Sequence, residues 1–282
     1  MYRLDIEEKK KIVIEKFNKQ NILFLQATNA FTEINKLFTD FNKQYSQILR
    51  EAFKPLQNIE LQGIEKDWLE AAESLGKNGW TLPMLMDVRD HFELSHINDI
   101  KEIDNSIEHY HADENVYKEL KSEVINHELT SEWKELLVQC FDNYEKENYL
   151  IVIPNLFMIF EGIAYNLIKP RYQKTIKANY SGTIKGPYNK VKEQIESDNT
   201  YIIYYSSIVE FINTTFRYGD FDNRTSRFDI INRNWVLHGR DNTCHWDKID
   251  ALRLFIALHT IIQLDFLLDE IEADEDEKEL IK

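Results

Sequence analysis

Glycine, proline and cysteine are all scarce in this chain of 282 residues. It contains 8 Gly and 5 Pro, too few to punctuate the many short strands and turns of a sheet protein. Lys, Glu, Leu, Ile and Asn are abundant instead, and apolar residues recur at helical spacing. The composition therefore predicts an all-α fold and argues against a turn-rich β protein.

The two cysteines, Cys140 and Cys244, provide no disulfide framework and fit a reducing compartment. The residues that follow Met1 are charged, unlike those of a secretory leader. The longest apolar run, Tyr149 to Phe160, spans 12 residues, whereas a membrane-spanning helix needs about 20. We therefore expect a cytoplasmic protein that has no membrane partner.

Positive charge is in short supply, because 34 Lys and Arg face 49 Asp and Glu, for a net charge of −15. This balance argues against indiscriminate binding to nucleic acids. Residues 169–192 depart from it, with seven cations and no acid. The first cations of this basic segment alternate with Tyr172 and Tyr180, a pattern that suits binding of an RNA backbone with stacking of its bases. A solvated basic loop explains the pattern equally well. These expected RNA contacts are Lys169, Arg171, Lys174 and Lys177.

The first 130 residues are expected to form an N-terminal helical region with a regulatory or sensing role. Apolar residues from Phe24 to Ala52 recur at alternating spacings of three and four, which predicts one long helix packed along other helices. Residues 99–130 are acidic with few strong apolar anchors, so we expect a solvated face or a linker there. The scattered His, Asp and Glu residues lack clean metal-ligand spacing, and neither a metal nor another cofactor is expected.

Residues 131–282 are expected to form a second helical domain that ends in an acidic tail. Apolar spacing predicts four helices, over residues 131–147, 150–168, 188–216 and 225–238. Gly239 is the expected stop of the fourth helix, and Asn242 or Thr243 the expected cap of a fifth. Glu161 is an acid inside the apolar helix 150–168. It either faces water or pairs with an arginine, because an unpaired buried charge is costly.

The run NRNWVLHGRD, residues 232–241, places Arg233 and His238 five residues apart. Arginine holds phosphate oxygens with a rigid fork and histidine transfers protons near neutral pH, so the pair suggests phosphodiester chemistry. The spacing alone is weakly specific, because Arg240 and His245 repeat it across an expected loop. On a straight helix, Arg233 and His238 also lie about 140° apart. They meet only if the helix distorts, the arginine bends across, or a second copy supplies one of them.

With Asn234 after the arginine, this run resembles the motif of HEPN domains, an all-helical family. The ribonucleases of that family carry Arg, a polar residue, three further residues and then His, which is the order of Arg233-Asn234-Trp-Val-Leu-His238. The apolar run FMIFEGIAYNL is similar to the core helix that precedes the motif in such proteins. The resemblance covers residues 131–270. Many relatives have Tyr two residues after the His, where this chain has Arg240.

The resemblance implies a metal-independent endoribonuclease that works as a homodimer with the motif at its interface. Arg233 and His238 would be catalytic, with Asn234 and Glu161 in supporting roles and Arg240 as a phosphate contact in place of the Tyr. RNA supplies its own nucleophile, the 2′-OH, so such a site needs a base, an acid and a cation rather than a metal.

The cellular role implied by the resemblance is that of a toxin in abortive infection, a form of antiphage defence. Such an enzyme must be restrained, so we expect a phage-derived trigger or an inhibitory partner. Some HEPN domains are non-catalytic, and the alternative is a module that dimerises or binds a nucleotide or a protein partner. Without a Gly-x-Ser-x-Gly or a Gly-rich Lys-Ser/Thr loop, α/β-hydrolase and P-loop enzymes are disfavoured.

Overall fold

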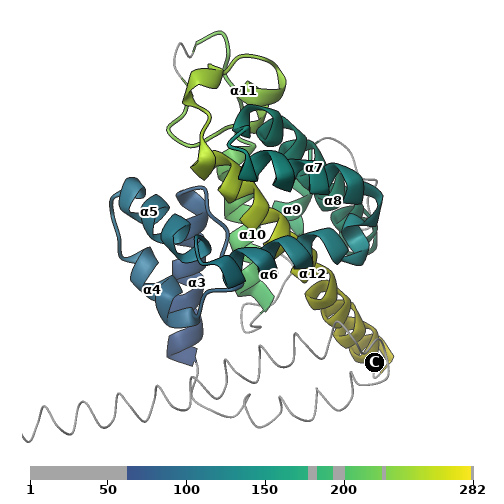
Figure 1. Ribbon diagram of the computed structural model, residues 1–282. Coiled ribbons are helices and arrows are strands. Elements are labelled where there is room, and N and C mark those ends of the chain that lie inside the picture. Colours follow the sequence, from purple (N-terminus) through teal and green to yellow (C-terminus); the bar gives the residue numbers. More distant parts are fainter. Residues whose placement is uncertain (1–61, 177–182, 193–200, 224–226, 281–282) are drawn as a thin grey trace, which may run out of the picture. The chain divides into compact units, whose positions relative to one another are not determined.

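The computed structural model describes residues 62–176, 183–192, 201–223 and 227–280. All regular secondary structure in these ranges is helical, which confirms the predicted all-α fold. The predicted long helix with its apolar residues from Phe24 to Ala52 lies outside them. The described α-helices (Figure 1) are α3 (Gln62–Lys77), α4 (Val88–Ser95), α5 (Ile100–His111), α6 (Glu114–Asn126), α7 (Lys134–Glu145), α8 (Tyr149–Ile176), α9 (Lys185–Lys192), α10 (Tyr201–Thr215), α11 (Arg233–Leu237) and α12 (Lys248–Leu280); two 3₁₀ helices are η1 (Glu128–Trp133) and η2 (Thr243–His245).

Aspartates fix the starts of the short helices in the acidic stretch. The side chain of Asp99 accepts a hydrogen bond from the first turn of α5, and that of Asp113 accepts two from the first turn of α6. Each helix also buries an apolar face, so the stretch is more than the solvated face or linker that we expected. The buried apolar residues of α5 and α6 are Ile103, Ile107, Leu120 and Val124.

Helices α8, α10 and α12 form the centre of the described unit. In Figure 1, α12 runs through the middle, and it packs against α8, α10, α6 and α5. Aromatic rings fill the contacts: Phe160 meets Phe211 edge-on at 5.3 Å between ring centroids, and Phe141 stacks on Phe255 at 4.0 Å. All four rings are fully buried, and each such side chain contributes about 1.5–3 kcal/mol to folding.

Helix α8 runs from Tyr149 to Ile176, beyond the predicted end at residue 168, and it contains Pro154 and Pro170. Its stretch Tyr149–Pro170 has 22 residues and a mean hydropathy of 1.7, so it is long and apolar enough to cross a membrane. The inference from the sequence that this apolar segment is too short to span a membrane was therefore wrong. In the structure, 56% of the most apolar window of this stretch is buried, a property that the central helix of a bundle shares.

Residues on both sides of the expected domain boundary at residue 130 share one hydrophobic core. Trp80 and Leu120 lie in the same buried cluster as Phe255. A buried hydrogen bond of 2.8 Å between the hydroxyl groups of Thr81 and Thr260 also joins the two sides. The packing of residues 62–280 therefore has no division at residue 130.

Two of the helices predicted near the motif differ in extent. The predicted helix 188–216 is described at its two ends, as α9 and α10, with residues 193–200 between them outside the described part. The predicted helix 225–238 is wrong, because α11 begins only at Arg233. Ile230 and Ile231, just before it, are buried in a non-helical stretch. The apolar pattern that suggested a helix here therefore reflects side chains that are buried from a non-helical backbone.

The cap predicted for the last helix is also wrong. Asn242 caps the 3₁₀ helix η2, where its side chain accepts from the backbone N–H of Cys244 at 3.0 Å. Helix α12 begins at Lys248, and Asp247 provides its cap by accepting from the backbone N–H of Asp250 at 3.0 Å. The two caps are close in sequence and both follow the preference of Asn and Asp for this position.

Candidate functional site around Arg233 and His238

Helix α11 carries the motif and is fixed at both ends. The side-chain oxygen of Asn232 accepts from two backbone N–H groups of the first turn, at 3.0 and 3.2 Å. Gly239 ends the helix with a φ of +63°, as predicted for a glycine stop. Arg233 is thus the first residue of a five-residue helix, and His238 follows its last residue. Figure 1 shows α11 at the end of the unit from which α12 starts.

Arg233 forms an ion pair with Glu161 of α8. Of the two alternatives for that acid, contact with water or an arginine partner, the structure therefore shows the second. Nε and Nη2 of Arg233 both donate to Oε2 of Glu161, at 2.9 and 2.6 Å. The two side chains are 22% and 27% exposed. Nη1 donates to Oδ1 of Asn234 at 3.1 Å. Because a guanidinium has five N–H groups, two remain for another acceptor such as a phosphate.

Asn234, the polar residue of the motif, links Arg233 to the loop that follows α10. Its Nδ2 donates to the backbone oxygen of Arg217 at 2.9 Å, and the capping asparagine donates to the same oxygen at 3.1 Å. The indole N–H of Trp235 donates to the backbone oxygen of Gly219 at 2.7 Å. These three bonds hold α11 against the loop in one arrangement.

His238 is exposed and lies against the same loop, at Phe221. The two rings meet edge-on with 5.7 Å between their centroids. The guanidinium of Arg240, which is also exposed, lies 5.6 Å from the centre of the Phe221 ring. Among the described side chains, no hydrogen bond or ion pair joins His238 to Arg233. The structure thus groups His238 with Arg240, and Arg233 with the carboxylate of α8.

A buried ion network fixes the segment between the motif and α12. Arg227 lies 3.9 Å from Asp241 and 3.6 Å from Asp250, and Asp250 lies 3.7 Å from Arg253. Arg253 also forms an ion pair with Asp104 of α5. Burial raises the pKa of Asp250 to about 6, although both arginines act against this rise. The network anchors the motif segment to the body of the unit.

The structure describes part of the basic segment, residues 169–192. The ammonium group of Lys169 lies 5.2 Å from the centre of the Tyr165 ring. Lys192 pairs with Glu73 at 3.0 Å and with Glu210 at 3.3 Å, so this cation is neutralised within the fold. The expected RNA contacts whose side chains lie outside the described part are Arg171, Lys174 and Lys177.

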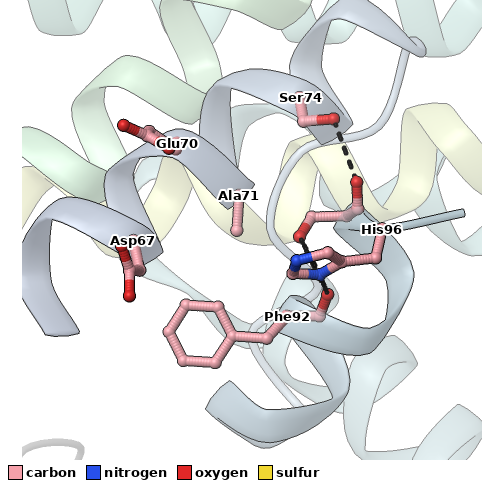
Figure 2. A pocket seen from close by; sticks show the side chains of 7 residues that line it. Asp67, Glu70, Ala71, Ser74, Phe92 and His96 are labelled. Atoms are coloured by element: carbon pink, nitrogen blue, oxygen red, sulfur yellow. Dashed lines mark hydrogen bonds between the residues drawn. The ribbon is translucent and has the colours of Figure 1, made fainter.

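A separate cavity of about 480 Å³ lies between α3 and α4. Figure 2 shows Phe92 and His96 of the α4 side facing the residues of α3 across it. It contains none of the site residues predicted from the sequence. Within the described ranges, no group of three or more His, Cys, Asp or Glu side chains is arranged to hold a metal ion. The residues that line the cavity are Asp67, Glu70, Ala71, Ser74, Phe92, Ser95 and His96.

Sequence reasoning missed the aromatic loop beside the motif. Tyr218 is 80% exposed and Phe221 36% exposed, and Phe221 contacts Trp235 and His238, which lie 14 or more residues later in the chain. A signal was present in the sequence, because Tyr218-Gly219-Asp220-Phe221 places two aromatic residues around a glycine between the predicted helices 188–216 and 225–238. That signal marks an aromatic turn and does not indicate which helix it contacts.

Comparison of the chain with protein-family models, with curated proteins and with solved structures found no match. The resemblance to HEPN domains therefore depends on the motif, its preceding apolar helix and the helical fold.

Proposed function

We propose that this chain is a metal-independent endoribonuclease in which His238 transfers a proton and arginines stabilise the phosphate charge. The observation that carries the proposal is the placement of an exposed imidazole and an exposed guanidinium on one aromatic ring, Phe221. One helical turn away, Arg233 is held by Glu161 and Asn234 and keeps two N–H groups for an acceptor.

The proposed reaction uses the 2′-OH of the RNA as its nucleophile. That oxygen attacks the adjacent phosphorus, a base removes its proton, and the bond from phosphorus to the 5′-oxygen breaks as an acid protonates the leaving oxygen. The products are a 2′,3′-cyclic phosphate and a 5′-hydroxyl. His238 supplies one of the two proton transfers, and the guanidinium groups of Arg233 and Arg240 stabilise the added negative charge on the phosphate oxygens.

A homodimer completes the proposed site. Within one chain Arg233 and His238 belong to separate contact groups, so a second copy supplies the missing partner across a two-fold axis. Apolar side chains on α8 support this arrangement: Leu150 is 51%, Ile151 58% and Met158 42% exposed. Met158 precedes Glu161 by three residues and so lies on a neighbouring part of the helix surface. A dimer through this face places the two motifs near each other.

The HEPN resemblance extends the proposal to the cell. An effector of abortive infection acts on RNA in the cytoplasm, where a phage-derived trigger or the loss of an inhibitory partner raises its basal activity. Lys169 and the other cations of residues 169–177 are the proposed contacts to the RNA backbone.

One observation favours a second candidate function, that of a non-catalytic HEPN-like module that dimerises or binds a nucleotide or a partner. Glu161 neutralises Arg233 in the structure, with two hydrogen bonds to one carboxylate oxygen. An arginine used in this way is a packing element between α8 and α11. In that case the segment after α11 displays His238 and Arg240 as binding groups only.

Incubation of the purified full chain with total RNA in EDTA separates the two candidates. The ribonuclease proposal predicts degradation by the wild-type chain and its loss in His238→Ala. His245→Ala is the matched control, because His245 is also exposed and belongs to the second Arg-x4-His spacing. If wild type leaves the RNA intact, or if His238→Ala cuts as fast as His245→Ala, the nuclease proposal fails.

A further inference from the structure

The loop from residue 217 to residue 223 exposes the side chains of Tyr218 and Phe221 to solvent. Asp220 has a φ of +46°, in the left-handed region that non-glycine residues rarely adopt. A Cβ atom on Gly219 would lie 2.5 Å from Cε1 of Phe221, so a larger residue at this position would force the ring to shift. The indole of Trp235 holds the same glycine through its backbone oxygen at 2.7 Å.

Three large side chains on and beside this loop are exposed to solvent. Tyr218 is 80% exposed and Phe221 36% exposed, and Leu237 of α11 is 37% exposed. Phe221 is in edge contact with His238 and lies under the guanidinium of Arg240. An imidazole and a guanidinium therefore lie within 6 Å of the centre of the Phe221 ring.

We propose that Tyr218, three residues before Phe221, forms a stacking platform for a base of single-stranded RNA; its role as a substrate site rests on the proposed ribonuclease function. Base faces are accessible in single strands and hidden in duplexes, and exposed aromatic rings are the usual surface on which they stack. A phosphate next to the stacked base is then within reach of Arg240.

The charges around the platform set the path of the strand. Asp222 is exposed and Asp220 is half-buried, and both lie in the same turn as Phe221. Asn223 donates to one carboxylate oxygen of Asp220 at 2.7 Å, which leaves its charge in place. Both carboxylates repel phosphates, whereas the guanidinium of Arg240 attracts them. The RNA backbone therefore passes over α11, next to His238, while the base faces the loop.

The platform is tested with fluorescently labelled 2′-O-methyl oligoadenylate, which lacks the 2′-OH and stays intact whether or not the chain is a ribonuclease. We expect the full chain to bind it, and Tyr218→Leu to bind about 5- to 100-fold more weakly. Tyr218→Phe is the matched control, because it keeps the aromatic face and loses only the hydroxyl. Asp222→Asn is expected to bind more tightly at low salt. A 2-aminopurine base in the same oligonucleotide should lose fluorescence on binding to wild type and regain it with Tyr218→Leu.

Equal affinity of Tyr218→Leu and Tyr218→Phe would overturn the platform, and so would failure of the wild-type chain to bind. A change of sedimentation coefficient in Tyr218→Leu, with oligonucleotide affinity unchanged, would place Tyr218 at a contact between copies and also overturn it. The two proposals fail separately. Tyr218-dependent binding without cleavage of natural RNA removes the ribonuclease and keeps the platform, and cleavage without Tyr218 dependence does the reverse.

Discussion

At the scale of single residues, the two ends of the motif have different surroundings and different expected roles in stability. Arg233 donates three hydrogen bonds to side chains of the protein, two of them to Glu161. His238 is exposed and has one ring contact, with Phe221. The lone acid in an apolar helix made an arginine partner one of two alternatives, the other being contact with water. The loop contact of His238 was not predictable, because it depends on how the turn after α10 folds back.

Substitution of Arg233 is expected to destabilise the fold, in contrast to substitution of His238. Arg233→Ala leaves Glu161 half-buried without its cation, and the loss of charged hydrogen bonds should lower the free energy of unfolding by about 2 kcal/mol. His238→Ala should change it by less than about 0.5 kcal/mol, as for surface positions. Arg240→Ala is the control for loss of an exposed arginine. Urea unfolding checks the order, and equal stability of the Arg233→Ala and Arg240→Ala variants would rule out a stabilising ion pair.

At the scale of elements, the motif depends on a helix of a single turn, α11. Isolated helices of this length do not form in water, so caps and tertiary contacts must hold it. The sequence pattern extended this helix back to residue 225 because Phe228, Ile231 and Trp235 have helical spacing. In the structure the capping Asn232 has an extended conformation, with φ −123° and ψ 124°, and the helix can begin only after it. Apolar spacing alone does not reveal such a start.

Loss of the Asn232 cap is expected to destabilise the fold. Asn232 is 2% exposed, and Asn232→Ala removes both the cap of α11 and a hydrogen bond to the backbone of Arg217. The expected loss is about 2 kcal/mol of unfolding free energy, the sum of a cap and a buried hydrogen bond. Asn242→Ala is the matched control, because it removes an exposed cap from the 3₁₀ helix η2. Thermal unfolding that shifts equally for the two variants would contradict the role of Asn232 as an anchor of the site.

At the scale of the whole molecule, the described helices share one core, and buried ionisable groups couple its stability to pH. Burial lowers the pKa of His91 and of His111 from 6.5 to about 4 in each case. The unfolded chain binds these protons below pH 6.5, whereas the folded chain does not. Stability is therefore lost as pH falls from 6.5 towards 4, by about 3 kcal/mol for each histidine. Asp250 opposes this, because its raised pKa of about 6 makes the folded state retain a proton between pH 6 and 4.

Two histidines outweigh one aspartate, so the free energy of unfolding should decrease between pH 6.5 and pH 4.5. Replacement of His91 by Gln should flatten this part of the profile, whatever it does to stability at neutral pH. His109→Gln serves as control, because His109 is exposed on α5. Urea denaturation at several pH values measures both slopes. A His91→Gln profile parallel to that of wild type would show that His91 is protonated equally in the two states.

The helix content and the glycine stop of α11 followed from the sequence, because each depends on local spacing. For Glu161 the sequence left two alternatives, water or an arginine, and the structure shows the arginine. The shared core across residue 130 did not follow from the sequence, because acidic helices such as α5 and α6 bury only two apolar side chains apiece near their centres. Their contribution depends on α12, more than 100 residues later in the chain.

The most direct test of the central claim is the chemistry of the RNA ends. An end-labelled single-stranded RNA is incubated with the full chain in EDTA, and the products are compared with those of the same RNA carrying a 2′-deoxy nucleotide at the main cleavage position. The account predicts a 2′,3′-cyclic phosphate or its hydrolysis product at each cut, no cut at the deoxy position, and no cut by His238→Ala. Cleavage that persists at the deoxy position, or in His238→Ala, would contradict it.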